Sequence, residues 1–427
     1  MFIRASVHAC EITPTGSVLL AGYPGLRRVS TGVLDPLLVS AVHLRGGSGG
    51  IILLSLDVYA LDPAIAARIR SKVSEATGTR EKCVFVGATR NHSGPVCCRP
   101  MSLFNDVSCA GADMSYVDYI VDQSVKAASE AAVASRPITL AVVPFDSPGT
   151  GAVLIRSDTG RIIGAVMVAA EIPCFLGPEN TGISADFLAG LRRRLAARFG
   201  GSPVVVYFPA PAADSLLTQP SAGPQLRHIE AGEAIAEGLV ARARMLKGGD
   251  FVQTAEFSGE MAAIGGLPRQ VPPEIVQAAA MMSEAGRREA EVFGRDGATA
   301  EERRQSRLRH WSARMAFNIA SARQAGALDD SCGAVEPWRM QVVRIGEVSI
   351  LGLPCLVEGN AARSIAGSVA NPVWMTEYVD GDMLGGVLGM ENEAAGSFEL
   401  LGSFYEPEAG RKVAASAVGL LRSIRPA

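Results

Sequence analysis

The sequence predicts an α/β protein with a layered, mixed β-sheet core that is flanked by helices. Hydrophobic residues make up 48% of the 427 residues and charged residues only 19%, so the chain can form a sizeable buried core. Along the chain, β-rich runs alternate with stretches of helical periodicity, which is typical of an α/β layer. We see no internal repeat or low-complexity linker, so we expect a single domain over residues 1–427.

Strands and tight turns are expected in the first part of the chain. Two β-rich runs at 39–44 and 50–58 flank the sequence RGGSGG, whose composition predicts a hairpin turn. Glycine-rich stretches also cradle phosphate, but this one lacks the GxxxxGK[ST] pattern and precedes a strand, so the hairpin is preferred. A helix at 63–77, a strand at 83–89 and a helix at 115–135 follow, which gives a β-α-β alternation.

The later elements continue the alternation and then depart from it. The predicted order is strands at 138–145, 152–157 and 162–170, a helix at 187–200 and a strand at 203–208. The span from about 225 to 325 reads as a helical, arginine-rich elaboration whose charges face solvent. Strands return at 338–354, and a helix at 410–424 closes the chain.

Charge and hydropathy exclude two classes of partner. The 40 basic and 43 acidic residues leave a net charge of −3, which argues against a nucleic-acid binder. The longest apolar run, from Ile162 to Leu176, contains Glu171 and Pro173 and is too short to cross a membrane. With no secretion signal in view, we expect a cytoplasmic protein with free thiols, whose partner is a small molecule. The sequence leaves open whether the protein also forms a homo-oligomer.

Several phrases of the sequence, taken in order, carry a family resemblance. They are EITPTGSVLLAGY (11–23), DPLLVSAVHL (35–44), ATRNHSGP (88–95), LGPENTGISADF (176–187), ILGLP (350–354) and GSFELLGSFYEPEAGRKV (396–413). Together they resemble the N-terminal catalytic domain of the neutral/alkaline, non-lysosomal ceramidases, and the resemblance extends over nearly the whole chain. It implies a zinc-dependent amidase, in which two His, a Glu and a Tyr hold the metal that activates water.

The zinc ligands implied by this resemblance are not kept. Their positions fall on Arg90, Ile172, Leu356 and Gly386, and a guanidinium is a fixed cation that cannot ligate zinc. The chain has only five histidines, so little else could replace them. We therefore expect no metal cofactor, and zinc only with a rearranged ligand set.

If the fold is retained, the former metal pocket should gather side chains from several strand ends. The expected lining is Arg90, His92, Glu171, Cys174 and Cys355, with Asp57 and Asn91 close by. Arg90, Asn91, Glu171 and Asp57 are the candidate substrate-binding residues, and His92, Cys355 and Cys174 are the candidate catalytic residues.

Three functions compete for this pocket. In the first, the protein hydrolyses a linear amide or related acyl bond of a small soluble substrate without zinc. Cys355 or Cys174 would be the nucleophile, and His92 would be the base that activates it. Arg90 would stabilise the oxyanion or hold a substrate carboxylate. In the plainer reading the cysteines are buried apolar residues, His92 is structural, and Arg90 forms a salt bridge with Glu171.

The other two functions do not use this chemistry. A different metal site could be built from His92, Glu171, Asp57 or Glu358 together with cysteine thiolates, although an arginine beside it would repel a cation. Alternatively, the chain is a non-catalytic, ceramidase-like protein that binds a small molecule or a partner. Fold alone does not choose among them, because function depends on the site.

Overall fold

The computed structural model describes residues 2–23, 26–47, 49–98, 112–211, 227–269, 271–328, 336–357, 359–377, 379, 386–387 and 404–424. Its centre is an eight-stranded mixed sheet in the order β10-β8-β7-β6-β1-β3-β4-β5. The strands are β1 (Arg4–Glu11), β3 (Leu38–Gly46), β4 (Gly49–Leu56), β5 (Val84–Ala88), β6 (Arg136–Pro144), β7 (Gly151–Ser157), β8 (Ile162–Ala169) and β10 (Val204–Pro209). Neighbouring strands are antiparallel except at the two edges, where β10 runs parallel to β8 and β5 parallel to β4.

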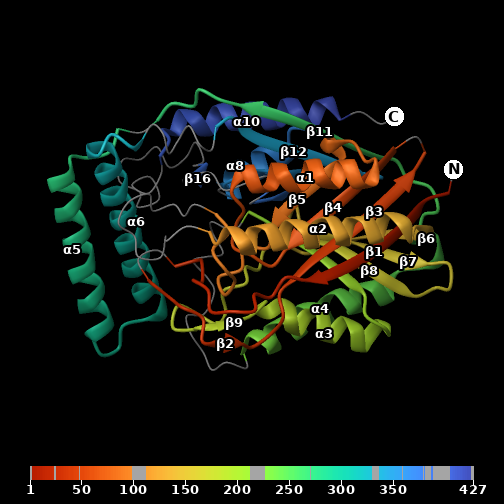
Figure 1. Ribbon diagram of the computed structural model, residues 1–427, viewed down its shortest axis with the longest axis horizontal. Helices are drawn as coiled ribbons and strands as arrows, with labels where there is room; N and C mark the ends of the chain where they lie inside the picture. The colour runs from red at the N-terminus through yellow and green to blue at the C-terminus, as the bar shows by residue number, and fades with distance from the viewer. Residues whose placement is uncertain are drawn as a thin grey trace.

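Four helices form a layer on one face of this sheet (Figure 1). They are α1 (Pro63–Thr77), α2 (Met114–Val133), α3 (Phe187–Phe199) and α4 (Arg227–Met245). Their apolar faces pack onto the sheet side chains in the largest buried cluster of the molecule. The start of α1 follows from its sequence, because Asp62 accepts a hydrogen bond from the backbone N–H of Ala64 and Pro63 fits the first helical position.

A second, four-stranded sheet packs on the opposite face of the large sheet. Its order is β11-β12-β13-β15, formed by β11 (Phe257–Ile264), β12 (Trp338–Ile345), β13 (Val348–Gly352) and β15 (Val373–Thr376). Helices α8 (Gly359–Ala366) and α10 (Pro407–Ser423) contribute to a third apolar cluster on the outer face of this small sheet. The layers are therefore helix, sheet, sheet and helix, which confirms the layered α/β class predicted from the sequence.

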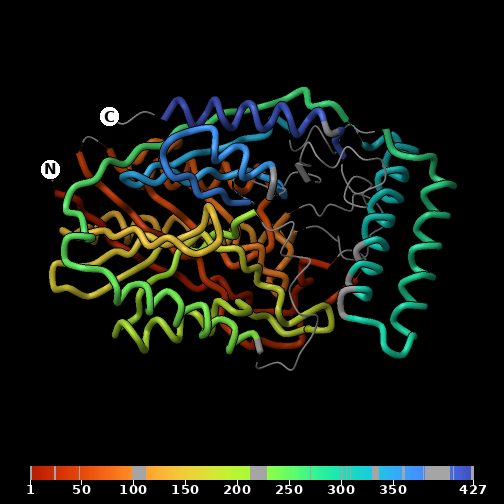
Figure 2. The backbone as a smooth tube through the Cα atoms, turned by 180° about the vertical axis from the view of Figure 1, so that it is seen from behind, coloured from red at the N-terminus to blue at the C-terminus, as the bar shows by residue number. Residues whose placement is uncertain are grey.

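Two short parallel pairs and a helical hairpin complete the described elements. The pairs are β2 (Gly32–Val33) with β9 (Gly182–Ile183), and β14 (Leu356–Val357) with β16 (Gly386–Val387). Two 3₁₀ turns are η1 (Glu81–Cys83) and η2 (Gly248–Asp250). Helices α5 (Ile275–Gly294) and α6 (Ala300–Gln324) stand side by side at the end of the molecule away from both termini (Figures 1 and 2).

The expected helical elaboration at about 225–325 is only partly what the structure contains. Helix α4, at the start of this span, packs against α3 inside the helix layer. Strand β11, which follows it within the span, belongs to the second sheet. Only the α5–α6 hairpin projects. The sequence FSGEMAAI of β11 does not alternate in a simple way, and its strand conformation depends on pairing with β12, which no local pattern encodes. None of the described helices is long and apolar enough to cross a membrane.

Candidate functional site

The loop after β5 contains the arginine that replaces the first expected metal ligand. Arg90 has a left-handed backbone conformation with φ of 63°, which is uncommon for a residue with a Cβ. Only 1% of the residue is exposed. Its Nη1 atom lies 2.9 Å from Oε2 of Glu377, a fully buried residue directly after β15. Each charge thus compensates the lost hydration of the other.

Glu377 connects the arginine to two further segments. Its Oε1 atom accepts a hydrogen bond of 2.7 Å from the backbone N–H of Val357 in β14, and its own N–H donates to the carbonyl of Pro209 at the end of β10. Sequence reasoning missed this residue. The sequence feature that could have identified Glu377 is its position directly after the apolar strand β15. Side chains at the carboxyl ends of strands often form binding sites in α/β proteins.

The expected salt bridge between Arg90 and Glu171 is wrong. Glu171 follows β8 and borders a surface pocket of about 250 Å³, which Asp146 and Arg242 also line. Its carbonyl accepts a hydrogen bond of 2.6 Å from the hydroxyl of Tyr207. Glu377 is the partner of Arg90 because the second sheet brings β15 against the end of β5, a contact between residues far apart in sequence.

His92 lies two residues beyond Arg90 in a closed, mostly aromatic environment. The rings of Tyr23 and Tyr59 pack edge-on against the imidazole, with centroids 4.9 and 5.1 Å away. Among the described residues, neither ring nitrogen has a hydrogen-bond partner. Burial, together with the charges of Arg90 and Arg28, lowers the pKa of His92 well below its usual value. The imidazole is therefore neutral at pH 7 and a poor general base.

The two candidate cysteines lie in different surroundings. The structure brings Cys174 beside His92, since the backbone N–H of His92 donates to the carbonyl of Pro173 at 2.8 Å. Burial and the carboxylate of Asp186 raise the pKa of the Cys174 thiol, so it is protonated at neutral pH. Cys355 is fully buried in the apolar cluster of the second sheet. The raised pKa of Cys174 does not favour a thiolate nucleophile, and Cys355 lies among apolar side chains.

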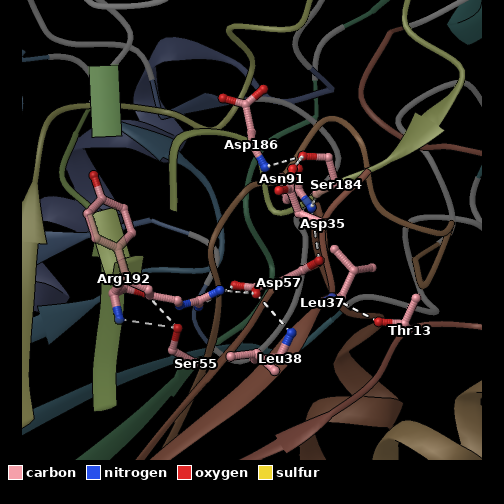
Figure 3. A network of polar contacts seen from close by, with 11 residues as sticks. Thr13, Asp35, Leu37, Leu38, Ser55, Asp57, Asn91, Ser184, Asp186 and Arg192 are labelled. Atoms are coloured by element: carbon pink, nitrogen blue, oxygen red, sulfur yellow. Dashed lines mark hydrogen bonds and ion pairs between the residues drawn. The ribbon is translucent and has the colours of Figure 1, made fainter. Parts of the chain in front are cut away.

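Asp57 and Asn91 hold the framework of the site together (Figure 3). Asp57 is fully buried and forms a two-point ion pair with Arg192 of α3, at 2.6 and 2.9 Å. The side-chain amide of Asn91 donates to the carbonyls of Asp57 and Ser184 at 3.1 and 2.8 Å. With these groups engaged, both residues tie the ends of β4 and β5 to the start of α3.

Asp186 joins the same framework from the N-terminus of α3. It has a left-handed φ of 54°, and its carboxylate accepts hydrogen bonds from the backbone N–H groups of Phe175, Leu176 and Phe187. Burial raises its pKa to about 6, although these hydrogen bonds act in the opposite direction. The carboxylate therefore fixes the loop that contains Cys174 against the helix start.

Helix α6 reaches the aromatic side of the site. The ring of Trp311 lies 6.0 Å from that of Tyr23, centroid to centroid. The guanidinium of Arg28 lies 4.6 Å from the centroid of the same Tyr23 ring and donates to the carbonyl of His92 at 2.7 Å. Sequence reasoning did not single out Tyr23, Arg28 or Trp311 as site residues, although Tyr23 ends the phrase at 11–23, because only the folded chain places the three together.

The described residues do not fit a zinc ion. Arg90 and Glu377 neutralise each other where the ceramidase resemblance places the first histidine ligand. The positions expected for the second His, the Glu and the Tyr contain Ile172, which is fully buried, and the Leu356–Gly386 pair of β14 and β16. Within the part of the chain that the structure describes, no three His, Cys, Asp or Glu side chains group to hold a metal. Glu358, a candidate for an alternative metal set, lies outside the described residues.

Fold and site together define a four-layer α/β protein with a buried arginine–glutamate pair at the ends of its strands. No protein-family model matches the sequence, and no curated protein matches it. Among solved structures, the chain is similar to a neutral ceramidase from Pseudomonas aeruginosa, with a TM-score of 0.72 and 15% identity over 100% of this chain and 75% of that one. A ceramidase complexed with C2 gives a TM-score of 0.71 at 15% identity, over 100% and 76% of the two chains. The chain therefore has the ceramidase fold that its sequence phrases predicted.

Proposed function

We propose that this chain is a ceramidase-like protein without a zinc centre, which binds a small molecule and does not hydrolyse it. The observation that carries the proposal is the ion pair between Arg90 and Glu377, 2.9 Å apart and buried. It stands at the position that the resemblance gives to a metal ligand. A guanidinium there repels a divalent cation, and the glutamate that could attract one is already neutralised.

The remaining candidate groups also support binding over turnover. A nucleophilic cysteine needs a lowered pKa, whereas burial raises that of Cys174. A general base works best with a pKa near the operating pH, whereas that of His92 is far below it. The framework residues Asp57 and Asn91 meanwhile keep the ceramidase-like segments in place.

The test is to incubate the purified protein with N-acetyl amino acids and short-chain ceramides, and to follow free amine over many hours. We expect no turnover above a buffer control. Denaturing the protein should also release a bound small molecule, which mass spectrometry identifies. This molecule should stay chemically unchanged when it is incubated with the protein. Amine release in proportion to protein concentration would overturn the proposal.

A hydrolase of small linear amides, working without zinc, is the second candidate. It is favoured by His92, whose two ring nitrogens have no partner among the described residues, beside the segment that contains Cys174. An approaching substrate that hydrogen-bonds to the imidazole would satisfy this buried polar group.

Substitutions separate the two candidates. If the protein is a hydrolase, His92→Ala or Cys174→Ser abolishes amine release, whereas His8→Ala in β1, which is not one of the site residues, leaves it unchanged. If it is a binding protein, no variant changes a rate that is already zero. Activity that survives both site substitutions would exclude this thiol mechanism.

A further inference from the structure

A separate pocket of about 590 Å³ lies at the other end of the large sheet. The candidate site follows the carboxyl ends of β4 and β5, whereas this pocket is lined by the β3–β4 hairpin and by the end of α1. The hairpin predicted for the RGGSGG sequence is present, and Gly46 and Gly49 pair within it. The pocket is therefore unrelated to the ceramidase-like residues. Its volume is in the range of small-molecule sites.

Three arginines from three segments line this pocket. Arg4 of β1 and Arg45 of β3 are paired directly across the two strands, and Arg80 comes from the loop after α1. Like charges at directly opposed positions destabilise a sheet unless something compensates them. Arg4 donates to the carbonyl of Ser135 at 2.6 Å, which satisfies one donor but adds no negative charge. No described residue lining the pocket is acidic.

A buried histidine forms part of the pocket wall. Only 5% of His43 is exposed, and its Nδ1 atom has no hydrogen-bond partner among the described residues. Gly50 lies beside this wall: a Cβ there would crowd Cγ of Arg45 at 3.1 Å and would be in ordinary contact with Nε2 of His43 at 3.6 Å. Burial and the charge of Arg45 lower the pKa of His43 to about 4, so the ring is neutral at pH 7 and offers one N–H donor.

We propose that this pocket binds a phosphate-bearing small molecule. Guanidinium groups match phosphate oxygens in pairs of hydrogen bonds, and three of them suit an anion with more than one charge. The C-terminal end of α1 at Thr77 also borders the pocket and has a partial negative charge, which the three full positive charges outweigh. Recognition uses arginine side chains, not the N-terminus of a helix, which explains why the sequence lacks a phosphate-loop motif.

Isothermal titration calorimetry with AMP, inorganic phosphate and acetate at low ionic strength tests the proposal. We expect AMP and phosphate to bind, and acetate to bind at least tenfold more weakly, because it has a single charge. The Arg45→Gln and Arg80→Gln variants, both changed at exposed side chains, should each weaken AMP binding about tenfold or more. The matched control is Arg244→Gln, which removes the same charge from an exposed position on α4 and should bind as the parent does.

NMR titration of the His43 ring gives an independent readout. Saturating phosphate should raise the pKa of His43 from about 4, since an adjacent anion favours the imidazolium. The proposal is overturned if AMP and phosphate fail to bind at millimolar concentration, or if Arg244→Gln weakens binding as much as Arg45→Gln. Equal binding of acetate would refute phosphate as the recognised group.

Discussion

The buried pair between Arg90 and Glu377 leads to a quantitative prediction about stability. Glu377→Gln keeps the shape of the side chain and an acceptor for the N–H of Val357, but it removes the negative charge that lies 2.9 Å from the guanidinium of Arg90. Removing one partner of a buried ion pair costs about 3–5 kcal/mol of unfolding free energy. Arg90→Met should have a similar cost, because it removes the positive charge that lies 2.9 Å from the buried carboxylate. The double variant, which removes both charges, should recover most of the loss.

Urea unfolding followed by tryptophan fluorescence measures all four proteins, and the double-mutant cycle gives the coupling energy. We expect coupling of at least about 2 kcal/mol, since the second substitution removes the buried charge whose direct counter-charge the first one removed. Glu408→Gln is the control, because Glu408 pairs with Arg411 on the exposed face of α10 and its loss should cost below about 0.5 kcal/mol. Single variants that cost no more than this control, or effects that simply add, would refute the assignment of a buried pair.

Three further predictions concern neighbouring groups. Asp186 has a pKa raised to about 6 in the folded protein, so its contribution to stability is full below about pH 4 and is lost as the pH rises through 6. The difference in unfolding free energy between the parent and Asp186→Asn should change by up to about 3 kcal/mol between pH 4 and pH 7.5, and a pH-independent difference would contradict the raised pKa. Asp57→Asn should destabilise by about 2–4 kcal/mol in the same urea assay, because it removes the charge that Arg192 pairs with; a cost below about 1 kcal/mol would show that the pair contributes little. Iodoacetamide at pH 7.5 should label Cys174 slowly, and Cys355 only after unfolding, as followed by mass spectrometry; rapid modification of either would restore the nucleophile hypothesis.

Local patterns predicted much of the fold. Apolar residues at helical spacing predict the helix at 63–77, and α1 has these bounds because Asp62, Pro63 and Gly78 define its two ends. The strand β11 was missed, since its conformation depends on β12, which lies more than seventy residues away. Separation in sequence also explains why only one member of the buried ion pair was predicted. The position of Arg90 followed from its motif, but its partner Glu377 is 287 residues away and only the packing of two sheets brings them together.

The same reasoning explains why the arginine pocket had no sequence signature. Arg4 and Arg45 are neighbours only through the pairing of β1 with β3, and Arg80 joins them because α1 crosses the sheet and ends there. A phosphate-loop motif is visible in a sequence because it depends on consecutive backbone N–H groups, whereas this pocket uses side chains from separate segments.

Zinc content tests the central claim, that an ion pair has replaced the metal centre. The parent protein, purified without chelator and then dialysed against excess zinc, should be passed through a desalting column and measured by inductively coupled plasma mass spectrometry. Because Arg90 and Glu377 neutralise each other, we expect far less than one equivalent of retained zinc. One equivalent of tightly bound zinc, lost on treatment with a chelator, would contradict it.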